Sequence, residues 1–163
     1  RQRVRWQVRL TGPARTSAMT EPRPAPARMF LVDDDPAAVM LIRIGLEECG
    51  VQAQLDVATS CRGALERLQG WAAGDDDTAP DLMLLDLNLG DGVGHEVLEF
   101  VRAQPVLART PVVILSTSSH VKDVERAKAA GADDYIVKPS SYDALLAILA
   151  GLGRYVRQVP VSA

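Results

Sequence analysis

The sequence is poor in the residues that mark several protein classes. Its 163 residues include two cysteines, two histidines and 4% aromatic residues. Two cysteines are too few for a disulfide framework or a zinc cluster, so we expect Cys49 and Cys61 to be reduced, as in a cytoplasmic protein. The apolar runs, such as residues 112–115, are far shorter than the ~20 residues of a membrane-spanning helix. No stretch has the form of a secretion signal, so we expect neither membrane insertion nor secretion.

The charge is distributed unevenly along the chain. Residues 1–28 carry seven arginines and one acidic residue, whereas residues 29–163 carry 11 basic and 20 acidic residues. Residues 1–28 also contain four prolines and show no helical or strand period, which predicts a disordered basic tail. Residues 1–18 are interpreted as upstream or added sequence, because Met19 starts a segment typical of a chain start. A flexible interaction tail and a targeting segment are the alternatives.

From Met29 onward, short apolar runs alternate five times with amphipathic stretches. Asp35, Ser60 and Ser141 are predicted N-caps of three of the intervening helices. Five such units predict an α/β fold with a parallel sheet and helices on both faces. Ligands bind such sheets beyond the carboxyl ends of the strands. The predicted strands lie at residues 29–32, 53–57, 82–85, 112–115 and 135–137.

Acidic residues and a lysine follow three of these strands. Asp33 and Asp34 follow the first strand, Asp86 follows the third, and Lys138 follows the fifth. Carboxylates brought this close repel one another, so either some of them are protonated or a cation lies among them. Oxygen ligands without histidine or cysteine favour Mg²⁺ or Mn²⁺. The set therefore predicts phosphoryl transfer to an aspartate, with the metal and the lysine neutralising the phosphoryl charge.

Other acidic residues have a simpler interpretation. Asp35 precedes Pro36 at a predicted helix start, where a capping aspartate and a first-turn proline are expected. Residues 75–77 are three consecutive aspartates in a segment with loop composition, and no strand end is predicted beside them. We interpret both features as structural or solvent-exposed.

Short motifs resemble the receiver domain of two-component response regulators of the CheY type. They read LVDDDP at residues 31–36, LLDLN at 84–88 and YIVKP at 135–139, with Ser116 between them. The resemblance covers residues 29 to about 150. It implies a doubly wound, flavodoxin-like sheet of five parallel strands in the order 2-1-3-4-5, with five helices. It also implies a receiver domain over residues 29–152, followed by a C-terminal extension over residues 153–163.

The resemblance assigns the phosphoacceptor and the metal ligands. Asp86 matches the phosphoacceptor of the family. Asp33 and Asp34 match its acidic pair, with Asp34 the more direct metal ligand. The main-chain carbonyl of Asn88 matches the group that completes the shell around Mg²⁺, for which Mn²⁺ is a substitute.

The resemblance also assigns the residues that respond to phosphorylation. Ser116 matches the hydroxyl that moves to the phosphoryl group, and Lys138 matches the phosphate-binding lysine. Tyr135 matches the aromatic residue that turns inward when the hydroxyl moves, although a half-buried aromatic on the last strand is the alternative. Pro139 matches a structural proline whose preceding peptide bond is cis in the family.

The sequence departs from the family pattern in one loop. Residues 89–94 read LGDGVG, and Gly90 stands where the family commonly has proline. Glycine restricts the backbone less than proline does, so we expect this loop to be more flexible. His95 and His120 lie at predicted helix starts without metal-ligand partners, and we expect both side chains to be solvated.

The resemblance implies a stand-alone response regulator that accepts a phosphoryl group from a histidine kinase and switches the face formed by helix four, strand five and helix five. About a dozen residues follow the last predicted helix, too few for a DNA-binding module. We therefore expect no nucleic-acid or membrane partner. Such a protein is not an enzyme in the usual sense, because it catalyses only its own phosphorylation and dephosphorylation.

A subgroup is indicated as well. Residues 74–80, 115–119 and 155–160 are similar to single-domain regulators phosphorylated by bacterial phytochrome kinases. A bacteriophytochrome is thus a candidate partner, and the subgroup implies a homodimer through the last strand and helix.

Three other functions compete with this interpretation. A phosphohydrolase with an aspartyl nucleophile usually has a general acid two residues further on, and Asn88 stands there instead. A binding module that is never phosphorylated would not need Asp34, Asp86 and Lys138 together. A phosphate sink or phosphorelay shuttle without direct output needs the same residues, so the sequence does not distinguish it from a response regulator with an output.

Overall fold

A computed structural model describes residues 26–74 and 79–155. Three predicted segments lie mostly outside the described residues: the basic tail (1–25 of 1–28), the acidic loop (75–78) and the C-terminal extension (156–163). The strands of the main sheet are β1 (Ala27–Val32), β2 (Ala53–Ala58), β3 (Leu82–Leu85), β6 (Val112–Ser116) and β7 (Asp134–Val137). The described α-helices are α1 (Pro36–Glu48), α2 (Cys61–Ala72), α3 (Gly94–Ala103), α4 (Val121–Ala129) and α5 (Tyr142–Gly151).

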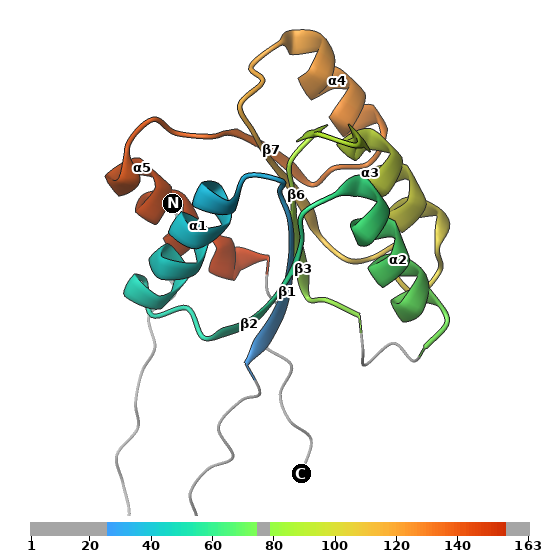
Figure 1. Ribbon diagram of the computed structural model, residues 1–163, viewed down its shortest axis with the longest axis horizontal. Coiled ribbons are helices and arrows are strands. Elements are labelled where there is room, and N and C mark those ends of the chain that lie inside the picture. The colour runs from blue at the N-terminus through green and yellow to red at the C-terminus, as the bar shows by residue number, and fades with distance from the viewer. Residues whose placement is uncertain (1–25, 75–78, 156–163) are drawn as a thin grey trace, which may run out of the picture.

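The sheet has the predicted topology. Its strands lie in the order β2-β1-β3-β6-β7, and all neighbouring pairs are parallel. This is the order 2-1-3-4-5 when the five strands of the sheet are counted along the chain, so the predicted flavodoxin-like fold is confirmed. Figure 1 shows the sheet nearly edge-on, with α1 and α5 on one side and α2 and α3 on the other.

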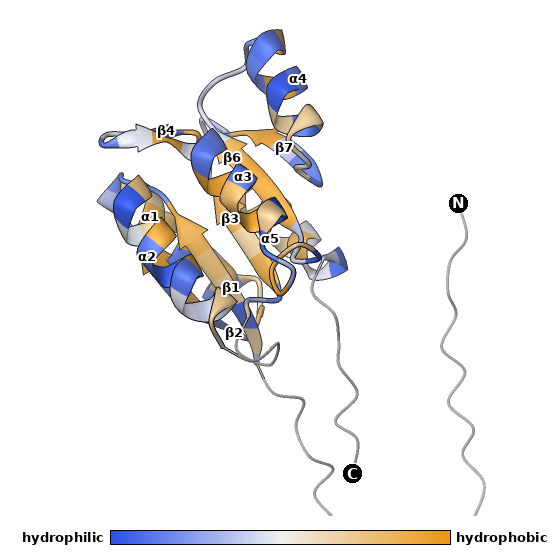
Figure 2. Cartoon of the chain, turned by 90° about the vertical axis from the view of Figure 1, so that its right-hand side faces the viewer, coloured by the Kyte–Doolittle hydropathy of each residue, from blue (hydrophilic) through white to orange (hydrophobic). Residues whose placement is uncertain are grey.

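The hydrophobic core consists of two layers, one on each face of the sheet. Strand β3 is buried along its whole length, and its residues alternate between the two layers: Leu82 and Leu84 face α1 and α5, while Met83 and Leu85 face α2 and α3. A strand buried on both faces is expected to be continuously apolar. Figure 2 shows this pattern, with hydrophobic strands in the middle and hydrophilic residues on the outer faces of the helices.

The predicted helix boundaries have the expected local causes. The side chains of Asp35, Ser60 and Ser141 accept hydrogen bonds from backbone N–H groups in the first turns of α1, α2 and α5, respectively. These bonds satisfy donors that a helix start otherwise leaves without partners. Gly50 and Gly131 follow α1 and α4 with φ angles of 68° and 95°, a conformation that glycine adopts without steric cost.

Two terminal boundaries differ from the predictions. Strand β1 begins at Ala27, two residues before the predicted start of ordered structure, because the Ala27 and Arg28 backbones pair with Ala53 and Gln54 of β2. Backbone pairing of this kind does not depend on apolar side chains, so the sequence pattern misses it. At the other end, the 3₁₀ turn η2 (Leu152–Arg154) continues α5 into the predicted extension.

His95 is buried, contrary to the prediction that its side chain is solvated. Its exposed fraction is 4%, and its Nδ1 atom has no hydrogen-bond partner. Burial lowers the pKa of the imidazole, and the nearby positive charge of Arg126 lowers it further.

Among the described helices, none is long and apolar enough to span a bilayer.

Candidate functional site

The parallel sheet brings the predicted acidic residues together at one edge. Asp33 and Asp34 follow β1, and Asp86 follows the adjacent strand β3. One carboxylate oxygen from each of the three residues lies within 4.8 Å of the others. Asp33 and Asp86 are buried, with exposed fractions of 1% and 5%, whereas Asp34 is exposed. The cluster therefore has two buried carboxylates and one at the solvent edge.

Lys138 joins the two buried carboxylates. Its Nζ atom lies 2.7 Å from Asp33 Oδ2 and 2.7 Å from Asp86 Oδ2. Lys138 follows β7, two strands away from β3, and its side chain reaches across the end of β6. Burial alone would lower the pKa of Lys138, but the hydrogen bonds from its ammonium group to Asp33 and Asp86 outweigh burial and raise it. Burial raises the pKa of Asp33 in spite of the bond to Lys138.

Each of the three carboxylates also accepts a backbone hydrogen bond. The N–H of Asp35 donates to Asp33 Oδ1 (3.0 Å), and the N–H of Asn88 donates to Asp86 Oδ1 (3.0 Å). The N–H of Gly90 donates to Asp34 Oδ2 (2.9 Å). Backbone donors are fixed by the fold, so these bonds hold the carboxylates in place before any ligand binds.

The donor set fits a divalent cation. Three ionised carboxylates and one ammonium group leave two negative charges, which Mg²⁺ or Mn²⁺ would neutralise. The available ligand atoms are oxygens, the type that both ions prefer. The exposed position of Asp34 also leaves the site open to water, several molecules of which Mg²⁺ retains in proteins. Asp33, Asp34 and Asp86 would hold the ion, and the Asn88 carbonyl remains the predicted fourth protein ligand.

The predicted switch residues lie beside this cluster. Ser116 is fully buried at the end of β6, and its Oγ accepts long hydrogen bonds from Asn88 Nδ2 (3.4 Å) and Ser118 N–H (3.4 Å). Tyr135 on β7 is half-buried, and its hydroxyl donates to the carbonyl oxygen of Ser118 (2.8 Å). The loop after β6 thus contacts both predicted switch residues.

The prediction of a cis bond before Pro139 is wrong for this structure, because the described residues contain no cis peptide bond. The isomer cannot be read from a dipeptide, since cis and trans forms before proline differ by only about 0.5–1 kcal/mol.

Two contacts at the site were missed by the sequence analysis. Gly90 was expected to make its loop more flexible, yet its N–H binds Asp34. Ser118 was not assigned a role, yet its hydroxyl donates to Asp123 on α4 and its carbonyl accepts from Tyr135. Backbone donors and acceptors exist at nearly every position, so no sequence signal marks the ones that matter.

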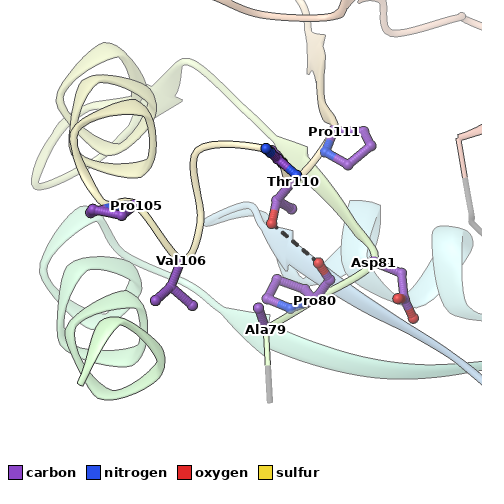
Figure 3. Close-up of a pocket in the computed structure, with 8 residues that line it drawn as sticks. Ala79, Pro80, Asp81, Pro105, Val106, Thr110 and Pro111 are labelled. Carbon is purple, nitrogen blue, oxygen red and sulfur yellow. Dashed lines mark hydrogen bonds between the residues drawn. The ribbon is translucent and has the colours of Figure 1, made fainter. Parts of the chain in front are cut away.

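A separate pocket lies at the opposite end of the strands, beside the amino ends of β3 and β6. Figure 3 shows it between the residues that precede β3 and the segment that leads into β6, where the Thr110 hydroxyl donates to the Pro80 carbonyl (3.3 Å). Its lining includes Asp81 and Arg109 but none of the predicted site residues. The pocket is therefore separate from the cluster of Asp33, Asp34, Asp86 and Lys138.

The chain matches the family model of the response regulator receiver domain over residues 29–150. It is 35% identical over 130 residues to the transcriptional regulatory protein TrcR of Mycobacterium tuberculosis, a match that covers 80% of this chain and 46% of TrcR. The chain thus spans about half the length of that curated relative.

Two solved structures share the fold. The phosphorylated cyanobacterial phytochrome response regulator RcpA is 33% identical, with a TM-score of 0.71 and coverage of 81% of this chain and 94% of RcpA. The Mn²⁺-bound form of response regulator Rcp1 is 29% identical, with a TM-score of 0.70 and coverage of 85% of this chain and 100% of Rcp1. Sequence, topology and site agree: the chain belongs to the receiver-domain family of two-component response regulators.

Proposed function

We propose that this protein accepts a phosphoryl group from a histidine kinase onto Asp86 in a reaction that requires Mg²⁺. The observation that carries the proposal is the arrangement of Asp86: a buried carboxylate 2.7 Å from Lys138 Nζ and clustered with Asp33 and Asp34. A carboxylate oxygen of Asp86 attacks phosphorus, the bond from phosphorus to the kinase histidine breaks, and the imidazole leaves. The product is an acyl phosphate on Asp86.

The residues around Asp86 perform separate tasks in this reaction. Lys138 supplies a positive charge beside the phosphoryl oxygens, and the Asn88 N–H holds the carboxylate in place. A bound Mg²⁺ ion would neutralise charge on the transferring group. Ser116 supplies a hydroxyl at the end of the adjacent strand, where it can donate to a phosphoryl oxygen.

The output surface in this proposal is the face formed by α4, β7 and α5. Tyr135 on β7 and Asp123 on α4 both bind Ser118, which lies in the loop directly after Ser116. A movement of Ser116 toward a phosphoryl group would therefore alter contacts on β7 and α4 together. This is a two-state device of the kind that links a local charge change to a distant surface.

The proposal includes a phytochrome-type kinase as partner and a stand-alone arrangement. The likeness to RcpA, a phytochrome response regulator, supports the partner. The stand-alone arrangement is supported by the coverage of 94% of the RcpA chain and 100% of the Rcp1 chain. It also includes a homodimer through β7 and α5. β7 is an edge strand of the described sheet, and Val137 on it is 43% exposed. Light scattering with and without phosphodonor tests the dimer.

Incubation with a small phosphodonor and Mg²⁺ tests the phosphoacceptor directly. The wild-type protein should acquire one acid-labile phosphoryl group, and Asp86→Asn should acquire none. Asp35→Asn is the matched control: Asp35 is a neighbouring acid that caps α1 rather than joining the cluster, and asparagine also caps helices. Equal labelling of wild type and Asp86→Asn would refute the assignment.

A further inference from the structure

The carboxylate of Asp34 has a different environment from those of its two partners. Asp33 and Asp86 are buried and share the ammonium group of Lys138, whereas Asp34 is exposed. Within residues 26–74 and 79–155, the Asp34 carboxylate accepts one hydrogen bond, from the N–H of Gly90 to Oδ2 at 2.9 Å. This single contact therefore limits the rotation of the one solvent-edge carboxylate of the cluster.

The Gly90 N–H is held in place by a small hairpin. Strands β4 (Asn88–Leu89) and β5 (Gly92–Val93) pair antiparallel, with Leu89 opposite Gly92, so Gly90 and Asp91 form the two-residue turn. The Asp91 carboxylate accepts hydrogen bonds from the N–H groups of Cys61 (2.7 Å) and Arg62 (3.1 Å) at the start of α2. The hydrogen bonds from Arg62 and Cys61 lower the pKa of Asp91. The turn is thus anchored to α2 on one side and to Asp34 on the other.

Gly90 also stands where receiver domains commonly have proline. Proline has no backbone N–H, so a receiver domain with proline at this position cannot make the bond to Asp34. The φ angle of Gly90 is not positive, so its backbone conformation does not itself require glycine. What glycine supplies here, and proline does not, is a hydrogen-bond donor.

We propose that the Gly90 N–H is a positioning group that orients Asp34 for binding of a divalent cation. It fixes Oδ2 and leaves Oδ1, which has no donor among the described residues, for the ion. The inference rests on the proposed function, because that function requires the metal site. Hydrogen-bond partners of metal-ligating carboxylates typically contribute roughly 10–100-fold to affinity. For an exposed ligand we expect the lower end of that range.

Calorimetric titration with Mg²⁺ tests the proposal on four proteins: wild type, Gly90→Pro, Asp34→Ala and the double variant. Gly90→Pro should weaken Mg²⁺ binding by about 10-fold in the wild-type background and have no further effect in the Asp34→Ala background, where the side-chain acceptor of the Gly90 N–H is gone. Gly90→Ala is the matched control because it keeps the N–H. Its Cβ would lie 3.2 Å from Asp34 Oδ2, so the carboxylate needs to move by only a few tenths of an ångström.

An independent measurement keeps the proposal testable if Gly90→Pro does not fold. In the wild-type protein, the Gly90 amide proton should exchange slowly, and Asp34→Ala should accelerate its exchange while leaving the Asn88 amide protected. Equal Mg²⁺ affinity of wild type and Gly90→Pro, or an equal loss in both backgrounds, would overturn the role of Gly90 alone. A wild-type protein that binds no Mg²⁺ would overturn the proposed function as well, so the two failures are distinguishable.

Discussion

Replacing Lys138 with methionine is the most informative perturbation of the buried charges. The substitution keeps an apolar stem but removes the ammonium group that lies 2.7 Å from both Asp33 and Asp86. The carboxylates of these residues are 1% and 6% exposed, so solvent screens them little. Removing one partner of a buried ion pair costs about 3–5 kcal/mol, because a buried charge is left without compensation.

Protonation sets an upper limit on this loss. The folded variant can relieve the repulsion by protonating Asp33, whose pKa is already raised by burial above the usual 3.8 of an aspartate. Holding that proton at pH 7 costs at most roughly 4 kcal/mol, since each pH unit above 3.8 corresponds to ~1.4 kcal/mol. We therefore expect a loss of about 3–4 kcal/mol in unfolding free energy at pH 7 without metal.

The pH dependence follows from the same argument. A carboxyl group whose pKa is raised by folding stabilises the folded state below its unfolded pKa, and that contribution is lost as pH rises through the folded pKa. The deficit of Lys138→Met relative to wild type should therefore be small near pH 4 and grow toward pH 7. Urea denaturation followed by circular dichroism, in the presence of a chelator, measures both effects.

The control for this experiment is Arg67→Met. Arg67 binds Asp56 at 2.8 Å, nearly the same distance, but the two side chains are 55% and 37% exposed. Exposed pairs contribute only about 0–1 kcal/mol. Equal losses for Lys138→Met and Arg67→Met, or a deficit that does not change between pH 4 and pH 7, would refute the reasoning.

Three further outcomes are expected. The unfolding free energy should fall as pH drops below ~6.5, by at most about 1.4 kcal/mol per pH unit. The cause is buried His95: its pKa is lowered in the folded state, so the unfolded chain binds the proton first. If His95→Gln showed the same dependence on pH as the wild type, this explanation would be wrong. Mg²⁺ at 100 times its Kd should stabilise the wild type by about 2.7 kcal/mol in thermal unfolding, and Asp34→Asn should lose most of that gain. Tyr135→Phe should cost about 1 kcal/mol in denaturant unfolding because the bond to the Ser118 carbonyl is lost; no change would show that this bond is unimportant.

The fold could be predicted because its signals are carried by side-chain type. Residues 82–85 and 112–115 are continuously apolar, as is typical of strands that are covered on both faces. The helix starts were predictable for a similar reason, since Asp35 and Ser60 are residue types that satisfy free N–H groups. The rule for parallel strands then placed Asp33 and Asp86 at the same end of the sheet. The strand order implied by the family resemblance made their two strands neighbours.

The features that the sequence did not reveal depend on backbone groups and on which side of a helix a residue faces. The β4–β5 hairpin has only two residue pairs, too few for an alternating pattern to show. The N–H of Gly90 is invisible in a sequence because almost every residue has one. His95 was misinterpreted because a polar residue suggests exposure, yet it lies three residues before Leu98 and so faces the same core as Leu98.

In the proposed function, the charges of the site link phosphorylation to cation binding. Asp33, Asp34 and Asp86 together with Lys138 carry a net charge of −2 when all are ionised. In the proposed reaction, a phosphoryl group of roughly −2 replaces the single charge of Asp86, which makes the site more negative by about one unit. A cation with two positive charges is therefore bound more strongly after phosphorylation than before. Binding free energies are reciprocal, so the ion favours the phosphorylated state by the same factor, and the orientation of Asp34 by Gly90 contributes to both.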